Sequence, residues 1–135
     1  MKNHILERLE GAGLLNTFKT IDSIKRDELL CLVSAKFLDA GKPRKELASQ
    51  WLDISKFSES EIRNAIVGLI ETGTKNIFAI WPSEKLAIEV DIEDFAKHHD
   101  DFWYPSSDDV WLTNARQTWL LMISHEEEIT FISRL

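Results

Sequence analysis

The sequence predicts an α+β fold, in which about four N-terminal helices pack on a C-terminal antiparallel sheet of about five strands with one short inserted helix. Up to residue 75, apolar residues recur mainly at the spacings of three and four that are typical of helices. From residue 76 onward the apolar period shortens to two, and short runs rich in β-branched and aromatic residues alternate with polar breaks. With 135 residues and no long linker, the chain is expected to form a single domain, mainly helical over residues 1–75 and mainly β over residues 76–135.

The expected helices carry recognisable start signals. Asp22 or Ser23 can accept hydrogen bonds from the free amides of a following helix. Pro43 suits the first turn of another helix, where its missing N–H has no partner to lose. Ser58 and Glu61 match the capping box, in which each side chain bonds the backbone amide of the other residue. The sequence therefore predicts helices over residues 2–10, 23–40, 43–52 and 58–73.

The second of these helices carries apolar residues on more than one face, which predicts a central and largely buried helix. The only cysteine, Cys31, lies within it and is expected to be a small buried hydrophobe. A single cysteine excludes an internal disulfide framework and suits a reducing compartment, so a cytoplasmic location is expected. No apolar run approaches the roughly 18 residues that a membrane span needs.

In the second half, residues 77–81 and 86–91 flank a Pro-containing turn and predict a β-hairpin. A short helix is expected over residues 92–99. The stretch 109–135 contains three apolar runs split by short polar breaks, which predicts a three-stranded meander. Residues 119–123 are apolar at every position, so both faces of the middle strand should be covered.

Charge is distributed unevenly along the chain. Residues 1–75 hold 12 Lys or Arg against 11 Asp or Glu, whereas residues 76–135 hold 4 against 12. The first part thus has a net charge of +1 and the second of −8, which accounts for the total of −7. Such acidity repels phosphate backbones and attracts basic partners. It is also compatible with a simple role in keeping a small protein soluble.

Residues 25–91 resemble a winged helix-turn-helix. Glu46-Leu47-Ala48 takes the place of the E-L-A on the first motif helix. The helix that follows repeats the rhythm of the second motif helix at Ser58, Ile62, Arg63, Ala65, Ile66, Leu69 and Gly73. The resemblance implies a DNA-binding regulator. The exposed positions oppose that function, because Glu59 and Glu71 share the recognition face with Arg63 and Asn64, and a DNA reader needs a basic face. Nucleic acid is therefore not the expected partner.

Signatures of catalysis and of bound cofactors are absent from the sequence. It contains no P-loop, no G-x-S-x-G elbow and no G-x-G-x-x-G. Asp94, His98 and Asp101 fall on one helical face and could hold a divalent ion. The same pattern also describes a solvated helix end at which histidine favours the dipole. We expect no enzyme activity, no cofactor and no metal.

Aromatic residues concentrate in the acidic half, where some can serve as binding anchors for a partner and others pack in the core. Trp111 should face opposite Val110 and Leu112, and Trp103 and Tyr104 lie in a connector. The residues expected to bind a basic partner protein are Glu89, Asp91, Asp94, Asp101, Trp103, Tyr104, Asp108, Asp109 and Trp111.

The run W-L-L-M-I-S-H-E-E-E-I-T-F at residues 119–131, together with the acidic α+β pattern, resembles small bacterial toxin-immunity proteins. The resemblance implies inhibition by occlusion. An acidic surface would dock on a basic, nuclease-type toxin, and its carboxylates would take the place of nucleic-acid phosphates. On this interpretation the acidic residues of the second half project together as one surface.

Overall fold

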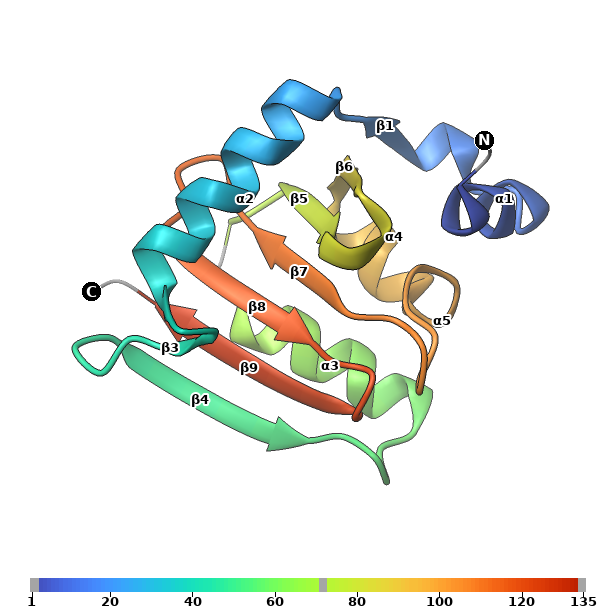
Figure 1. The fold of residues 1–135 in the computed structure, drawn as a ribbon. Helices are drawn as coiled ribbons and strands as arrows, with labels where there is room; N and C mark the ends of the chain where they lie inside the picture. Colours follow the sequence, from blue (N-terminus) through green and yellow to red (C-terminus); the bar gives the residue numbers. More distant parts are fainter. Residues whose placement is uncertain (1–2, 71–72, 134–135) are drawn as a thin grey trace.

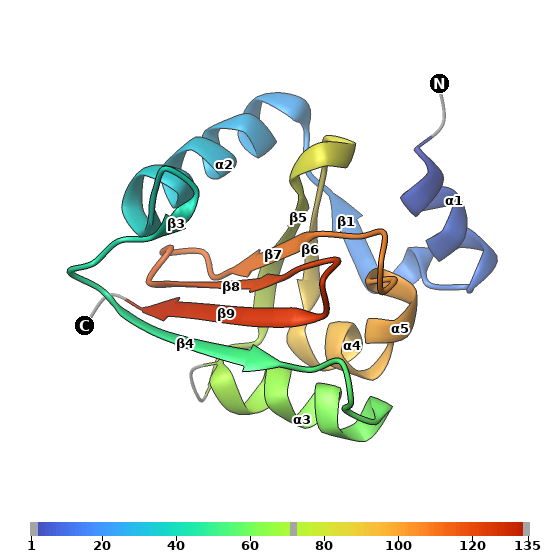
Figure 2. The ribbon, with the colours of Figure 1, turned by 60° about the horizontal axis from the view of Figure 1, so that its bottom comes forward.

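The computed structural model describes residues 3–70 and 73–133, and within them a seven-stranded antiparallel sheet carries helices on both faces (Figure 1 and Figure 2). The strand order is β1-β6-β5-β7-β8-β9-β4. The α+β class is thus confirmed. The strands are β1 (Phe18–Thr20), β4 (Ala48–Asp53), β5 (Asn76–Trp81), β6 (Leu86–Asp91), β7 (Val110–Thr113), β8 (Trp119–Ile123) and β9 (Glu128–Ser133).

The five strands of the second half are those expected, and two further strands come from the first half. The hairpin β5–β6 and the meander β7–β8–β9 pair in antiparallel register. Strands β1 and β4 add to the two ends of this sheet, although the sequence predicts no strand at the first and a helix at the second. Middle strand β8 is covered on both faces, as expected, and only Met122 of its five residues is partly exposed.

The helix expected over residues 43–52 is not formed. The chain instead makes a short ribbon from β2 (Leu38–Asp39) and β3 (Lys42–Pro43), then edge strand β4. Pairing with β9 bonds alternate backbone groups of β4 and places Leu52 beside Ile129 over the core, so tertiary pairing outweighs the local spacing of three and four. The first helix of the winged-helix motif is therefore missing from this fold.

Helix α2 (Ser23–Phe37) begins as expected, because the Asp22 side chain accepts the Lys25 amide. It ends three residues early, where β2 starts. The expectation of a largely buried helix is wrong. Only Leu29, Val33 and Phe37 are buried, Ile24 is 73% exposed, and Cys31 is exposed. The physical reason is that α2 lies on the outside of the sheet and needs one apolar stripe only.

Helix α3 (Glu59–Leu69) confirms the capping box of Ser58 and Glu61. It is shorter than expected, and residues 71–72 of the expected helix lie outside the described residues. Gly73 adopts a φ of +91°, a conformation that favours glycine. The remaining helices are α1 (His4–Gly11), α4 (Ile92–Lys97) and α5 (His99–Phe102), with single 3₁₀ turns at Leu15–Thr17 and Pro82–Glu84.

Two apolar clusters lie on opposite faces of the sheet. The larger one unites α1, α3, α4 and α5 with side chains such as Ile88, Leu121 and Ile129. The smaller one joins α2 to residues such as Leu120 and Ile132. Strand alternation separates the two sets, since neighbouring residues point to opposite faces. None of the helices that the structure describes has the length and hydrophobicity that a bilayer crossing requires.

Candidate functional site

The residues expected to form one binding surface lie on several sides of the molecule. Glu89 and Asp91 are on β6, near the β1 end of the sheet. They line a shallow hollow of about 200 Å³ together with Lys19. Asp94 belongs to α4 and lines a separate groove of about 430 Å³ beside α3, where Arg63 and Lys97 also lie. Each of these acidic residues thus has basic side chains nearby.

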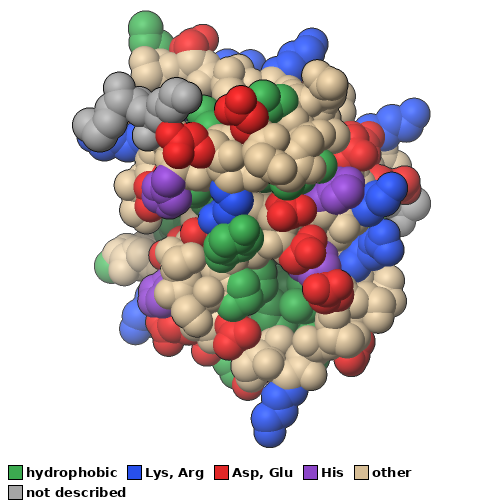
Figure 3. Space-filling view, turned by 90° about the vertical axis from the view of Figure 1, so that its right-hand side faces the viewer, with side chains coloured by type: hydrophobic (Ala, Val, Ile, Leu, Met, Phe, Trp, Pro, Cys, Tyr) green, Lys and Arg blue, Asp and Glu red, His purple; other side chains and the backbone are tan. Residues whose placement is uncertain are grey.

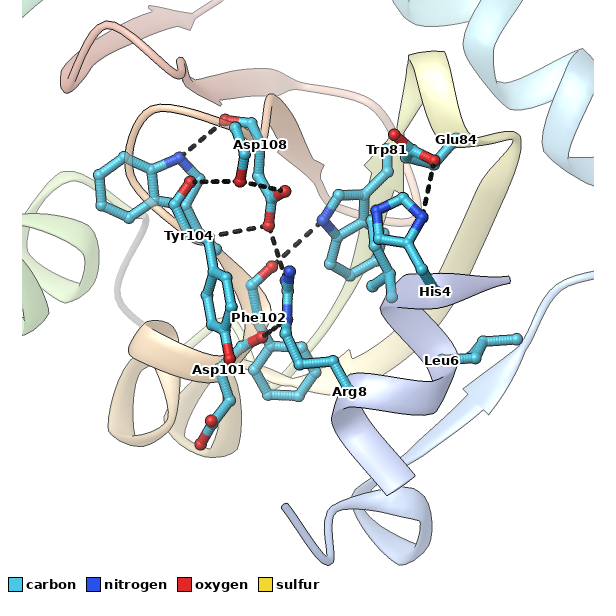
Figure 4. Close-up of polar contacts among 12 residues, drawn as sticks. His4, Leu6, Arg8, Trp81, Glu84, Asp101, Phe102, Tyr104 and Asp108 are labelled. Carbon is cyan, nitrogen blue, oxygen red and sulfur yellow. Dashed lines mark hydrogen bonds and ion pairs between the residues drawn. The ribbon is translucent and has the colours of Figure 1, made fainter. Parts of the chain in front are cut away.

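Asp108 is buried and paired, contrary to the expectation that it faces a partner. Its side chain is 3% exposed, and its Oδ2 lies 2.6 Å from Nη2 of Arg8 on α1 (Figure 4). The same oxygen accepts the Tyr104 backbone amide at 2.9 Å. Ser107 donates its hydroxyl to the other carboxylate oxygen at 3.1 Å. Asp108 therefore organises the loop over residues 103–109 and is unavailable to a partner.

Trp103 is likewise buried, at 2% exposure, and its indole donates to the Asp108 carbonyl at 3.0 Å. Tyr104 is 41% exposed, and its ring stacks on Arg8 with 3.7 Å between the guanidinium carbon and the ring centroid. Arg8 also donates to the Asp101 carbonyl at 2.9 Å (Figure 4). This cluster attaches α1 to the sheet half, so its main role is structural.

Figure 3 looks onto the side of the molecule where α1 and α5 lie. Carboxylates surround a small apolar patch there, but lysine, arginine and histidine side chains are interspersed among them. Asp108 and Trp103 are buried, so the nine expected residues do not all belong to one exposed surface. The connecting loops and α4 carry those residues to different sides of the sheet, which the linear charge pattern does not reveal.

The structure shows an uncovered strip on the sheet face that carries α2. Strand register aligns one row of side chains across four strands, namely Trp111, Met122, Thr130 and Trp51, which we call the open row. Helix α2 packs on the next row, where Leu120 and Ile132 are fully buried. Figure 1 shows α2 crossing only part of the sheet, with no helix in front of the arrowheads of β8 and β4.

Exposure confirms that the open row is accessible. Trp51 is 59% exposed, and the other three residues are half-buried. Trp111 does face opposite Val110 and Leu112, as the alternation predicts, since both of those are buried in the larger cluster. Sequence reasoning missed Trp51 because the stretch around it was expected to be a helix. Its spacing to Leu47 and Ala48 contains no signal that would have indicated an edge strand.

Carboxylates border the open row at one end. Asp53 pairs with Glu128 in the register of β4 and β9, and the backbone carbonyl of Glu128 accepts the Ser124 amide just after β8. Asp109, just before β7, accepts the His125 amide at 2.8 Å. We call Asp53, Glu128 and Asp109 the acidic fringe. Within residues 3–70 and 73–133, none of the three forms an ion pair with lysine or arginine.

Two titratable groups at the acidic fringe, Asp53 and the His125 that contacts Asp109, have shifted pKa values. The backbone amide of Ser55 bonds Asp53 and lowers the pKa of that carboxyl, with smaller contributions from the Ser55 side chain and from Lys56. The side-chain hydrogen bond to Asp109, at 2.9 Å, raises the pKa of His125. Asp53 therefore stays ionised to lower pH than an ordinary aspartate, and His125 holds its proton to higher pH than an ordinary histidine.

The described residues offer no grouped ligands for a metal ion, since no three His, Cys, Asp or Glu side chains among them come together. Asp94 and His98 bracket the end of α4, where the His98 amide donates to the Asp94 carbonyl. His99 is buried, with its ring nitrogen 2.9 Å from the Ala96 carbonyl. The His99 ring thus has a structural partner, whereas the contact of His98 is made by its backbone.

Neither a scan against models of known protein families nor a search of curated proteins finds a match for this sequence. The open row contains two tryptophans and a methionine, residue types that are enriched in protein interfaces, and carboxylates lie along one of its ends.

Proposed function

We propose that the protein is a non-enzymatic binding module that receives a basic protein partner on the open row and the acidic fringe. The observation that carries this proposal is the juxtaposition of an exposed Trp51 with Asp53 and Glu128, two carboxylates that form no ion pair with a lysine or arginine among residues 3–70 and 73–133. Tryptophan is enriched among the residues that dominate binding energy. Unpaired carboxylates steer a cationic partner toward the surface and fix its orientation.

The resemblance to toxin-immunity proteins gives this module a specific role. The partner would be a basic, nuclease-type toxin, and the acidic fringe would take the place of the phosphates that such an enzyme binds. Trp51, Trp111 and Met122 would cover apolar surface around the toxin site and exclude the substrate. Activity would be blocked by occlusion, without chemistry on either protein.

The test is titration of this protein with the purified product of the neighbouring reading frame, by calorimetry at low and at high salt. A basic product should bind, and its affinity should fall as salt rises, because the attraction between unlike charges is screened. Trp51→Ala should weaken binding by roughly 30-fold, equivalent to about 2 kcal/mol for a central aromatic anchor. Glu128→Gln should lower the affinity and also weaken its dependence on salt, because one of the attracting charges is removed.

Matched controls are Glu89→Gln and Asp91→Asn, which remove equal charge at the opposite end of the sheet. These two variants should bind as the wild type does. If the control and fringe variants lose the same amount of affinity, the effect depends on net charge alone, and the assigned surface is refuted. Absence of binding by a basic neighbour, or binding that ignores salt, would refute the proposed function itself.

A further inference from the structure

In the part of the chain that the structure describes, strand β4 has an unpaired outer edge in addition to its exposed Trp51. It is the terminal strand of the sheet, and among the described residues β9 is its only partner. Such an edge presents free backbone groups that can pair with another chain, and most proteins protect it with a very short strand, a lysine, a proline or a bulge. At the opposite end β1 has such protection, being three residues long with Lys19 at its centre. The six residues of β4 contain no lysine or proline, and their register to β9 is unbroken.

The hydrogen bonds show which backbone groups of β4 are free. Ile54 donates its amide to the Glu127 carbonyl, so this residue pair is hydrogen-bonded. In an antiparallel ladder such pairs alternate with pairs that point their N–H and C=O groups away from each other. Leu52, Gln50 and Ala48 therefore bond to β9. Ser49, Trp51 and Asp53 direct their amides and carbonyls outward.

We propose that two copies of this chain associate edge to edge through β4, in an antiparallel pair with two-fold symmetry. A register centred on Trp51 places it beside Trp51 of the partner subunit and exchanges both of their backbone hydrogen bonds. The same register sets Ser49 against the partner subunit's Asp53, so every outward group of these three residues has a partner. The two sheets become one continuous sheet, with both α2 helices on the same face.

The side chains are complementary in this register. The only charged residue of β4 is Asp53, and it faces a serine, so no like charges oppose each other across the pair. The two exposed indoles form an aromatic cross-strand pair on the α2 face, which is the side of the sheet left uncovered.

Two copies of this chain each carry a net charge of −7 and repel each other, and dissolved salt screens this repulsion. Association should therefore strengthen with salt. This is the reverse of the salt dependence expected for a basic partner, although both events use Trp51. The proposal does not depend on the proposed function, and the sign of the salt effect separates them.

Sedimentation velocity from micromolar to millimolar protein, at low and high salt, tests the dimer. The wild type should shift from monomer to dimer with concentration, and more so at high salt. Ser49→Pro removes one outward N–H, and proline is tolerated on an edge strand whose N–H faces solvent. This variant should remain monomeric, whereas the matched control Ser49→Ala should dimerise as the wild type does.

Hydrogen exchange gives a second readout that does not need a variant. The amides of Ser49, Trp51 and Asp53 should gain protection as concentration rises, while those of Leu52 and Gln50 should be protected throughout. A wild type that remains monomeric at millimolar concentration in both salts would overturn the proposal. So would equal dimerisation of Ser49→Pro and Ser49→Ala, or concentration-independent exchange at the three outward amides.

Discussion

The contact between Arg8 and Asp108 illustrates how a single residue acquires a role that its neighbours in the sequence do not indicate. Asp108 follows two serines and precedes another aspartate, a pattern that predicts a solvated acidic loop. Its actual partner is 100 residues away, on α1. Because the loop returns over the sheet, the carboxylate is buried and collects an arginine, a backbone amide and a serine hydroxyl.

Asp108→Ala should destabilise the protein by about 3–5 kcal/mol, because removal of one member of a buried ion pair leaves the other charge uncompensated. Urea denaturation measures this free energy of unfolding. The control is Glu84→Gln, which removes an exposed contact between His4 of α1 and the 3₁₀ turn after β5. That variant should lose less than about 1 kcal/mol, as exposed pairs do. Equal losses in the two variants would contradict the structural role assigned to Asp108.

The pair of Asp109 and His125 makes a prediction about pH. Asp109→Asn removes the main cause of the raised pKa, so the pKa of His125 should fall toward its ordinary value of 6.5. An NMR titration of the His125 ring protons measures the change. Since the folded-state pKa is the higher one, the pair stabilises the fold fully below 6.5, and that contribution is lost as pH rises through the raised pKa.

The stability difference between wild type and Asp109→Asn should accordingly be greatest in acid and shrink above neutrality. His4 provides a control within the same titration, because Asp109 forms no contact with it and its signal should be unchanged. A His125 titration curve identical in both proteins would show that Asp109 does not set this pKa.

At the scale of elements, those with local signals were predicted well. The capping box of α3 depends on Ser58 and Glu61, which are three residues apart, so the sequence contains all the information needed. Strand β4 has no such signal. Leu47, Ala48, Trp51 and Leu52 fit a helical stripe, and only pairing with β9, about 80 residues later, makes the extended form more stable. Long-range pairing of this kind is not encoded in a short window.

Ser58→Ala should cost about 1 kcal/mol of stability, because the first turn of α3 loses its capping acceptor. Thermal or urea unfolding measures the loss. Ser60→Ala is a suitable control, since Ser60 lies in the same exposed turn and contacts only the Ser58 hydroxyl among the described side chains. It should change stability by less than about 0.5 kcal/mol, as surface substitutions usually do. Equal effects of the two substitutions would contradict the capping role of Ser58.

At the scale of the whole molecule, the carboxylates of the acidic second half are carried by several separate elements. Helix α4, the loop over residues 103–109 and the strand ends distribute its carboxylates around the sheet, and Arg8 takes one of them out of solvent. Of the nine expected binding residues, Asp109 and Trp111 lie at the open row and its fringe. Trp51 and Asp53 join them from the half that was expected to be helical.

The sequence by itself determined the α+β class, the hairpin, the meander and the caps of α2 and α3, because alternation and capping act over a few residues. Only the tertiary structure decided that residues 48–53 form an edge strand, that α2 leaves part of the sheet uncovered, and that Asp108 is buried. These features arise from contacts between segments far apart in the chain, where the energy of pairing and burial exceeds the local preference of each segment.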